Sequence, residues 1–142
     1  MESKVLEAIR KFILEEHNVY ELWYNASVPK DKKWFKLKIA DEFDDDYHLV
    51  FPDGSEYKKK KLCKTIFDDY GSSNDFKIKI KKLTLKEISK DIFLARYQEW
   101  QYYDGKRQNK RITVSVLKID KDTGRIISLH THESPIEYTP GM

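Results

Sequence analysis

The sequence predicts an α+β domain in which N-terminal helices pack on a curved antiparallel sheet. Two observations lead to this fold class. Apolar residues early in the chain recur every three or four positions, which is the period of a helix with one buried face. After residue 75 they recur every second position, which is typical of strands with one buried face. Because the helices precede the strands instead of alternating with them, the order favours α+β over a parallel sheet.

The N-terminal half is expected to hold three helices and one short strand. A helical stripe that includes Ile9 and Ile13 continues to Tyr24, before Asn25 and Pro29 end it. The second helix is expected from Asp31 to Glu42 and the third from Tyr57 to Tyr70, with Gly71 as its stop. An acidic turn at residues 44–46 leads into the short strand, Tyr47 to Phe51.

The C-terminal half is expected to be a run of strands. Phe76 to Lys81 alternates strictly, and residues 83–88 form a further short strand. The longest strand, Ile92 to Tyr103, turns at Asp104-Gly105 and returns as Arg111 to Ile119. The last strand runs from Arg125 to Glu133. We expect a single domain over residues 1–135 and an irregular tail over 136–142.

Composition narrows the functional classes. Net charge is +3, from 27 basic and 24 acidic residues, and a nucleic-acid-binding protein usually has a larger excess of one sign. The lysine run from Lys58 to Lys61 is interpreted as a solvated helix start. There is one cysteine, no stretch long enough to span a membrane and no signal-peptide core, so we expect a cytoplasmic protein.

Several local motifs resemble the nuclear-transport-factor-2-like (NTF2-like) superfamily, especially its SnoaL-like and ketosteroid-isomerase-like branches. The similarity extends over nearly the whole chain, although each motif is short. The motifs are Glu21-Leu22-Trp23-Tyr24, Tyr47 to Gly54, Ala95 to Glu99, Arg111 to Leu117 and Leu129 to Pro135.

This resemblance implies a cone-shaped domain with a pocket open at one end and a homodimer joined through its sheets. It does not imply a reaction, because one fold can carry many functions. We therefore expect a protein that binds a small apolar or mixed-polarity molecule, with no cofactor. The alternatives are an isomerase or lyase with a His or Glu general base in the pocket, and a non-catalytic dimeric interaction module.

Strand alternation predicts two faces for the sheet. If the Asp104-Gly105 hairpin is regular, Glu99 pairs with Arg111 and Tyr97 with Thr113. Because a single bulge exchanges the two faces beyond it, the pocket could be lined by either set. One set contains Tyr97, Glu99, Arg111, Leu129, Thr131 and Glu133, and the other contains Trp100, Ser128, His130 and His132.

The candidate ligand-binding residues come from both faces and from the end of the first helix. Glu99 and Arg111 could anchor a polar ligand, with Glu99 as a general base, or could form an ordinary cross-strand ion pair. His132 is the second candidate base, because histidine titrates near neutrality.

The other candidates are His130 and three aromatic residues. His130 and His132 have a metal-ligand spacing but lack placed partners, so no metal is expected. Trp23, Tyr24 and Tyr97 could line an apolar pocket or form core.

Overall fold

The three α-helices and the long C-terminal strands follow one another in the order that the sequence predicts, and a short strand, Glu56–Lys58, is added before the third helix. The computed structural model describes residues 4–136, apart from the side chains of residues 107 and 108. Of the expected tail, residues 137–142 therefore lie outside the described part. Among the described residues, no helix is both long and apolar enough to cross a membrane. The elements are α1 (Lys4–Tyr24), α2 (Lys32–Lys38), the 3-10 helix η1 (Ala40–Glu42), β1 (Phe43–Val50), β2 (Glu56–Lys58), α3 (Lys59–Asp68), β3 (Lys77–Ser89), β4 (Ile92–Tyr103), β5 (Lys106–Ile119) and β6 (Ile126–Pro135).

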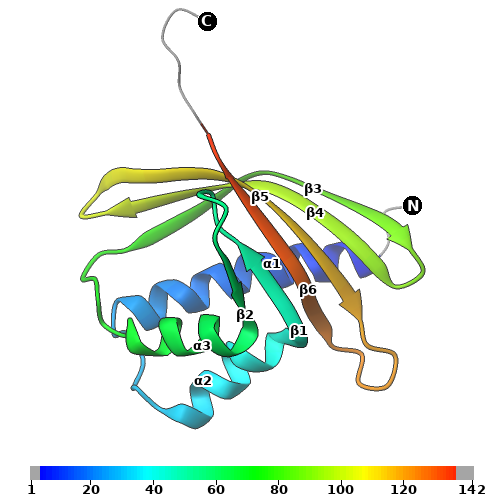
Figure 1. Cartoon of the computed structure of the whole chain (residues 1–142), viewed down its shortest axis with the longest axis horizontal. Helices are drawn as coiled ribbons and strands as arrows, with labels where there is room; N and C mark the ends of the chain where they lie inside the picture. Colours follow the sequence, from blue (N-terminus) through cyan, green and yellow to red (C-terminus); the bar gives the residue numbers. More distant parts are fainter. Residues whose placement is uncertain (1–3, 137–142) are drawn as a thin grey trace, which may run out of the picture.

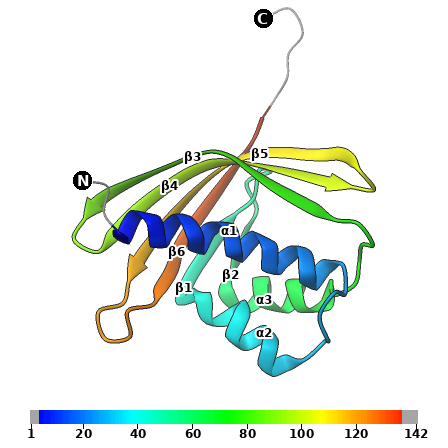
Figure 2. The ribbon, with the colours of Figure 1, turned by 180° about the vertical axis from the view of Figure 1, so that it is seen from behind.

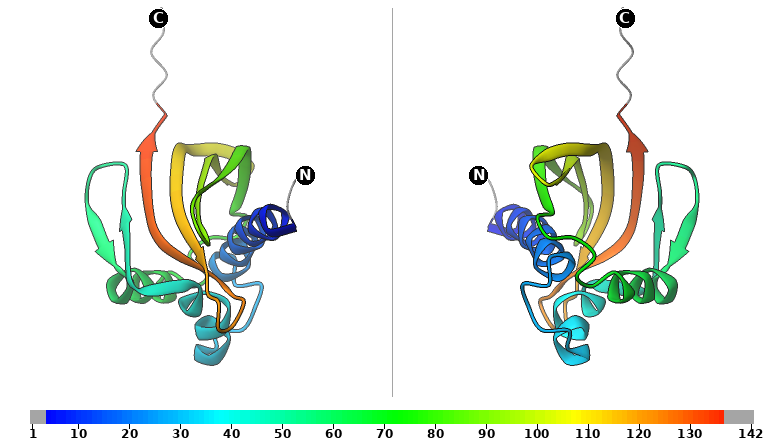
Figure 3. Two further views of the ribbon diagram at one scale, coloured as in Figure 1. Left: turned by 90° about the vertical axis from the view of Figure 1, so that its right-hand side faces the viewer. Right: turned by 90° about the vertical axis from the view of Figure 1, so that its left-hand side faces the viewer.

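The described strands form one curved sheet of six strands in the order β2-β1-β6-β5-β4-β3. All neighbours pair antiparallel except β1 and β6, which are parallel, so the sheet is mixed. The three α-helices lie together on one side of it (Figures 1 and 2). The end views in Figure 3 show how strongly the sheet bends. This is the expected α+β arrangement of helices packed against a curved sheet.

Two apolar clusters fix α1 against the rest of the domain. Near its start, Ile9 and Ile13 pack on Phe93 and Leu117 of the sheet. At its other end, the fully buried Trp23 packs among residues of α2, α3 and β1. Burying each such side chain stabilises the fold by about 1.5–3 kcal/mol relative to leaving it in water. The helix is therefore held at both ends.

The helices are shorter than the sequence predicts at two places. The second ends at Lys38 and is followed by η1, with Asp31 as its N-cap, where the side chain accepts a hydrogen bond from the backbone N–H of Lys33 at 2.9 Å. The third begins at Lys59, because residues 56–58 form β2 and pair with the end of β1. The acidic residues 44–46, expected as a turn, lie within β1 at a shift in its register with β6.

Bulges explain two further differences in the strands. The two strands expected between Phe76 and Ile88 are one strand, β3, with an irregularity at Lys82, whose φ is +56°. A second irregularity lies between β5 and β6, where Leu117 pairs with Ser128 but Val116 pairs with His130. The extra residue, Leu129, shifts the alternation, so Ser128 is on the buried face in place of Leu129.

Candidate functional site

A cavity of about 200 Å³ lies between the buried face of the sheet, α1, β1 and α3. Its walls combine aromatic rings with charged side chains. An outer groove, formed with the turn between β1 and β2, shares Phe51 and Arg111 with the cavity. Phe51 and Arg111 therefore lie at the opening of the cavity. The polar wall comes from α1 and from the three neighbouring strands β4, β5 and β6.

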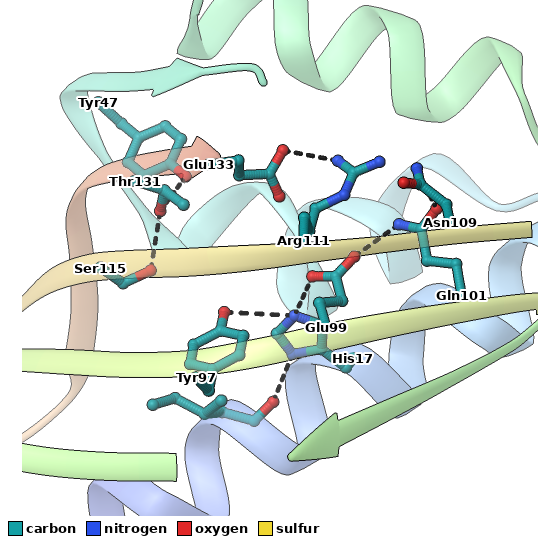
Figure 4. Close-up of polar contacts among 11 residues, drawn as sticks. His17, Tyr47, Tyr97, Glu99, Gln101, Asn109, Arg111, Ser115, Thr131 and Glu133 are labelled. Atoms are coloured by element: carbon teal, nitrogen blue, oxygen red, sulfur yellow. Dashed lines mark hydrogen bonds and ion pairs between the residues drawn. The ribbon is translucent and has the colours of Figure 1, made fainter. Parts of the chain in front are cut away.

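A buried ion pair joins α1 to β4 in this wall (Figure 4). His17 follows Ile9 and Ile13 at four-residue spacing, so it lies on the buried face of α1. Its Nδ1 donates to the carbonyl of Ile13 at 2.8 Å, and its Nε2 lies 3.0 Å from Oε1 of Glu99. The side chains are 6% and 8% exposed. The other oxygen of Glu99 accepts a hydrogen bond from Gln101 at 2.6 Å.

Burial and pairing act against each other on this pair. Burial disfavours the charged form of His17, but the hydrogen bond and charge of Glu99 outweigh it and raise the pKa of His17 to about 9. Burial alone would raise the pKa of Glu99, but His17 holds that pKa below its usual value. The pair is therefore an imidazolium and a carboxylate at neutral pH. The hydroxyl of Tyr97 lies 3.4 Å from Nε2 of His17.

A second buried ion pair joins β5 to β6. Arg111 donates from Nη1 to Oε1 of Glu133 at 2.7 Å, and the two side chains are 13% and 8% exposed. Burial and the nearby charge of Glu99 outweigh Arg111, and they raise the pKa of Glu133 to about 7. The predicted pairing of Glu99 with Arg111 on the backbone is confirmed, although the hairpin is not regular and its register shifts between Gln101 and Tyr102. The ion pair considered as an alternative for these two side chains is not the one formed, because Glu99 pairs with His17 and Arg111 pairs with Glu133.

A chain of hydroxyl groups continues the polar wall along the strands. The hydroxyl of Tyr47 on β1 donates to Oγ1 of Thr131 on β6 at 2.6 Å, and Oγ of Ser115 on β5 lies 3.1 Å from the same atom. All three residues are buried. Hydrogen bonding thus links three strands at one side of the cavity (Figure 4).

Three polar atoms of cavity-lining residues have no hydrogen-bond partner among the described residues. They are Oε2 of Glu16, Nε of Arg111 and Oγ1 of Thr113. Burial is the main cause that raises the pKa of Glu16 to about 7. Because buried polar groups in proteins are nearly always paired, these atoms are candidates for contact with a ligand.

The model of one protein family, sucrose-6-phosphate phosphohydrolase C-terminal, matches residues 8–137. The chain belongs to this family. Its fold is NTF2-like, as the resemblance of its motifs implies. A comparison with curated proteins found no match.

Solved structures share the fold of this family member at low sequence identity. An NTF2-like protein of unknown function from Pseudomonas aeruginosa is 23% identical, with a TM-score of 0.81 over 92% of this chain and 99% of that one. An NTF2-like protein of unknown function from Pseudomonas putida is 14% identical, with a TM-score of 0.71 over 97% and 92%. The yeast UBP3-associated protein BRE5 is 10% identical, with a TM-score of 0.74 over 96% and 99%. Such identities establish the fold alone.

The structure of this family member brings together four of the expected site residues. Tyr24, Tyr97, Glu99 and Arg111 line the cavity. Trp23 lies instead in the apolar core, where its Nε1 donates to the carbonyl of Ile66 at 2.8 Å.

The two histidines of the last strand lie on the face of the sheet that points away from the cavity. There the rings of His130 and His132 are 6.4 Å apart, and His48 of β1 is 6.2 Å from His130. Within residues 4–136, no group of three or more His, Cys, Asp or Glu side chains could hold a metal ion. Of the two alternative linings, the one with Tyr97, Glu99 and Arg111 therefore faces the cavity.

The sequence reasoning missed His17 and Glu16. Both lie on α1, and they meet the sheet only in the folded chain. The four-residue spacing of Ile9, Ile13 and His17 was the signal that could have placed His17 on the buried face. No comparable signal marks Glu16.

Proposed function

We propose that this protein binds a small molecule of mixed polarity in the cavity, in the manner of a SnoaL-like binding protein. The observation that carries the proposal is a buried charged network beside unfilled space. Replacing buried ion pairs with packed apolar residues often leaves stability unchanged or improves it. Fold stability alone therefore does not account for two ion pairs and an unpaired carboxyl around a cavity of about 200 Å³.

The size and walls of the cavity limit the ligand. Pockets that enclose drug-sized molecules usually measure about 300–1,000 Å³, so this one suits a smaller molecule with a single ring or a short chain. Tyr20, Phe43 and Phe76 offer apolar contact, whereas Glu99 and Arg111 offer hydrogen bonds and charge. A ligand with an apolar body and polar ends fits both walls.

A thermal-shift screen of small metabolites tests this function. We expect at least one compound to raise the unfolding temperature of the wild type in proportion to its concentration. Leu49→Trp adds bulk to the cavity wall and should abolish that shift. Leu14→Trp, the same substitution at an exposed position of α1, should retain it. A screen without any stabilising compound, or a shift that survives Leu49→Trp, would reject the proposal.

Proton transfer in the cavity, of the isomerase or lyase type, is the second candidate function. Its supporting observation is that the pKa of Glu133 is raised to about 7, which suits a general base near neutral pH. Glu99, the base expected from the sequence, is less suited because His17 lowers its pKa. His132 lies outside the cavity. The test is NMR of a bound compound in D₂O, where Glu133→Gln should stop proton exchange or turnover; an unchanged rate would exclude Glu133.

We also propose that the outer face of the sheet joins two copies of this chain. Leu94, Ile112, Val114 and Val116 lie half-buried on that face, and together they form an apolar surface on β4 and β5. Light scattering should show a dimer that Val114→Glu converts to a folded monomer. A monomeric wild type would favour an interaction module that presents this surface to a different partner.

A further inference from the structure

The charged side chains that line the cavity do not balance. His17 is paired with Glu99 and Arg111 with Glu133, at 3.0 Å and 2.7 Å. Glu16 remains, and among the described residues it has no ion-pair partner. Two cations thus face three carboxyl groups. A ligand that enters this cavity meets one acidic group that has no ion pair of its own among the described residues.

Glu16 is a buried acidic group whose ionised form a nearby positive charge would stabilise. Its Oε2 is buried and unpaired, and burial raises its pKa to about 7. The nearby carboxyl of Glu42, whose Oε2 is also unpaired, has its pKa raised to about 8 by burial and by the charge of Glu16. A cation beside Glu16 would favour the ionised form of both groups.

The walls near Glu16 are aromatic. Tyr20 lies one helical turn after Glu16 on α1, and the ring of Phe43 lies 4.5 Å from that of Tyr47. All three residues line the cavity. Aromatic faces attract ammonium groups and need not form hydrogen bonds to them. A carboxylate among such rings is the usual chemistry of an amine-binding site.

The other unpaired groups of the cavity can donate hydrogen bonds. Nε of Arg111 is a donor, and the hydroxyl of Thr113 can donate or accept. Thr113 is 1% exposed, so water outside the protein does not satisfy it. A ligand with a hydrogen-bond acceptor, such as a hydroxyl or carbonyl oxygen, would give both of these groups a partner.

Building on the function proposed above, we propose that the cavity selects small molecules that carry a protonated amine. Glu16 and the surrounding rings hold the ammonium group, and Arg111 and Thr113 accommodate a hydrogen-bond acceptor on the same ligand. The competing possibility is that Glu16 stays protonated and the cavity prefers neutral ligands. These two possibilities predict different orders of affinity for ligands that differ only in charge.

Matched ligands of different charge distinguish them. The probes are benzylamine, benzyl alcohol and benzoate, with butylamine, butanol and butyrate as an aliphatic set, titrated at pH 7.5 and followed by protein NMR. In at least one set the amine should bind about tenfold more tightly than the alcohol, with the acid weakest. Glu16→Gln should remove the preference for the amine over the alcohol. Glu15→Gln, the neighbouring glutamate on the exposed side of α1, should retain it.

The outcomes separate this proposal from the function on which it rests. Equal or tighter binding of the alcohols, or an amine preference that survives Glu16→Gln, would overturn amine selection while the cavity remained a binding site. The same holds if neither set binds but the metabolite screen finds a neutral or anionic ligand. If the screen also finds no ligand, the binding function itself fails, and amine selection fails with it.

Discussion

Replacing Glu99 with Gln should lower the free energy of unfolding by about 3 kcal/mol at pH 6, because it leaves His17 without its counter-ion. Two routes give this magnitude. Removing one partner of a buried ion pair typically costs about 3–5 kcal/mol. Independently, the pKa of His17 rises from 6.5 to about 9, and at about 1.4 kcal/mol per unit this also corresponds to about 3 kcal/mol. Gln keeps the shape and the acceptor oxygen, so charge is the main property that changes.

The effect should depend on pH in a definite direction. The pKa of His17 is higher in the folded than in the unfolded state, so its stabilising contribution is complete below pH 6.5 and is lost as pH rises through about 9. Arg111, Glu16 and Tyr97 also face the pair, and they remain in the variant. The difference between wild type and Glu99→Gln should therefore be largest near pH 6 and small above pH 9.

Urea unfolding followed by circular dichroism at pH 6, 7.5 and 9 measures this difference. Glu15→Gln is the matched control, because it neutralises a carboxylate whose ion pair with Lys11 spans 3.8 Å on an exposed helix surface. It should change stability little at any of these pH values. A loss below about 1 kcal/mol for Glu99→Gln at pH 6, or a loss that grows with pH, would refute a charged His17–Glu99 pair.

Three further predictions concern the same cavity. The pKa of both Glu16 and Glu133 rises from 4.5 to about 7 on folding, so the stability that their protonated forms contribute is complete below pH 4.5 and is lost as pH rises through 7. The unfolding temperature should therefore fall from pH 5 to pH 7.5, and a rise over this range would contradict the prediction. Thr131→Val removes the acceptor of the Tyr47 hydroxyl and should cost about 1–3 kcal/mol in urea unfolding, whereas no change would show that this bond contributes nothing. Arg111→Met should destabilise more than Arg111→Met combined with Glu133→Leu, because the single change leaves a buried carboxylate unpaired; equal losses would argue against the ion pair.

The sequence was sufficient for the parts of the fold that depend on local pattern. The strand predicted from Ile92 to Tyr103 is β4, because alternating apolar residues and the Asp104-Gly105 turn fix its extent. Its register with β5 also depends on a shift between Gln101 and Tyr102, which no local pattern predicts. The strand Glu56–Lys58 was missed, because three residues are too few to show a period. The parallel pairing of β1 with β6 brings together segments about 80 residues apart, and no local pattern specifies it.

The candidate site was recoverable to the extent that it lies on one hairpin. Tyr97, Glu99 and Arg111 share a face by strand alternation, and that face lines the cavity. Their ion-pair partners were not identified from the sequence, although strand alternation placed Glu133 on the same face as Arg111. His17 on α1 precedes its partner Glu99 by 82 positions in the chain. Glu133 on β6 pairs with Arg111 on the neighbouring strand β5 along a diagonal, because Arg111 lies opposite Pro135.

The position of the charged groups within the core explains how the cavity keeps its shape. The apolar cluster around Ile9 and Ile13 and the cluster around Trp23 lie on either side of His17 along α1. Each cluster packs α1 against different partners, so the helix cannot shift toward the sheet and close the cavity without disrupting one of them. Glu16 and His17 are thus presented to the space between the clusters by a helix held at both ends. The two clusters supply the packing that stabilises the fold, and the polar wall between them is left for binding.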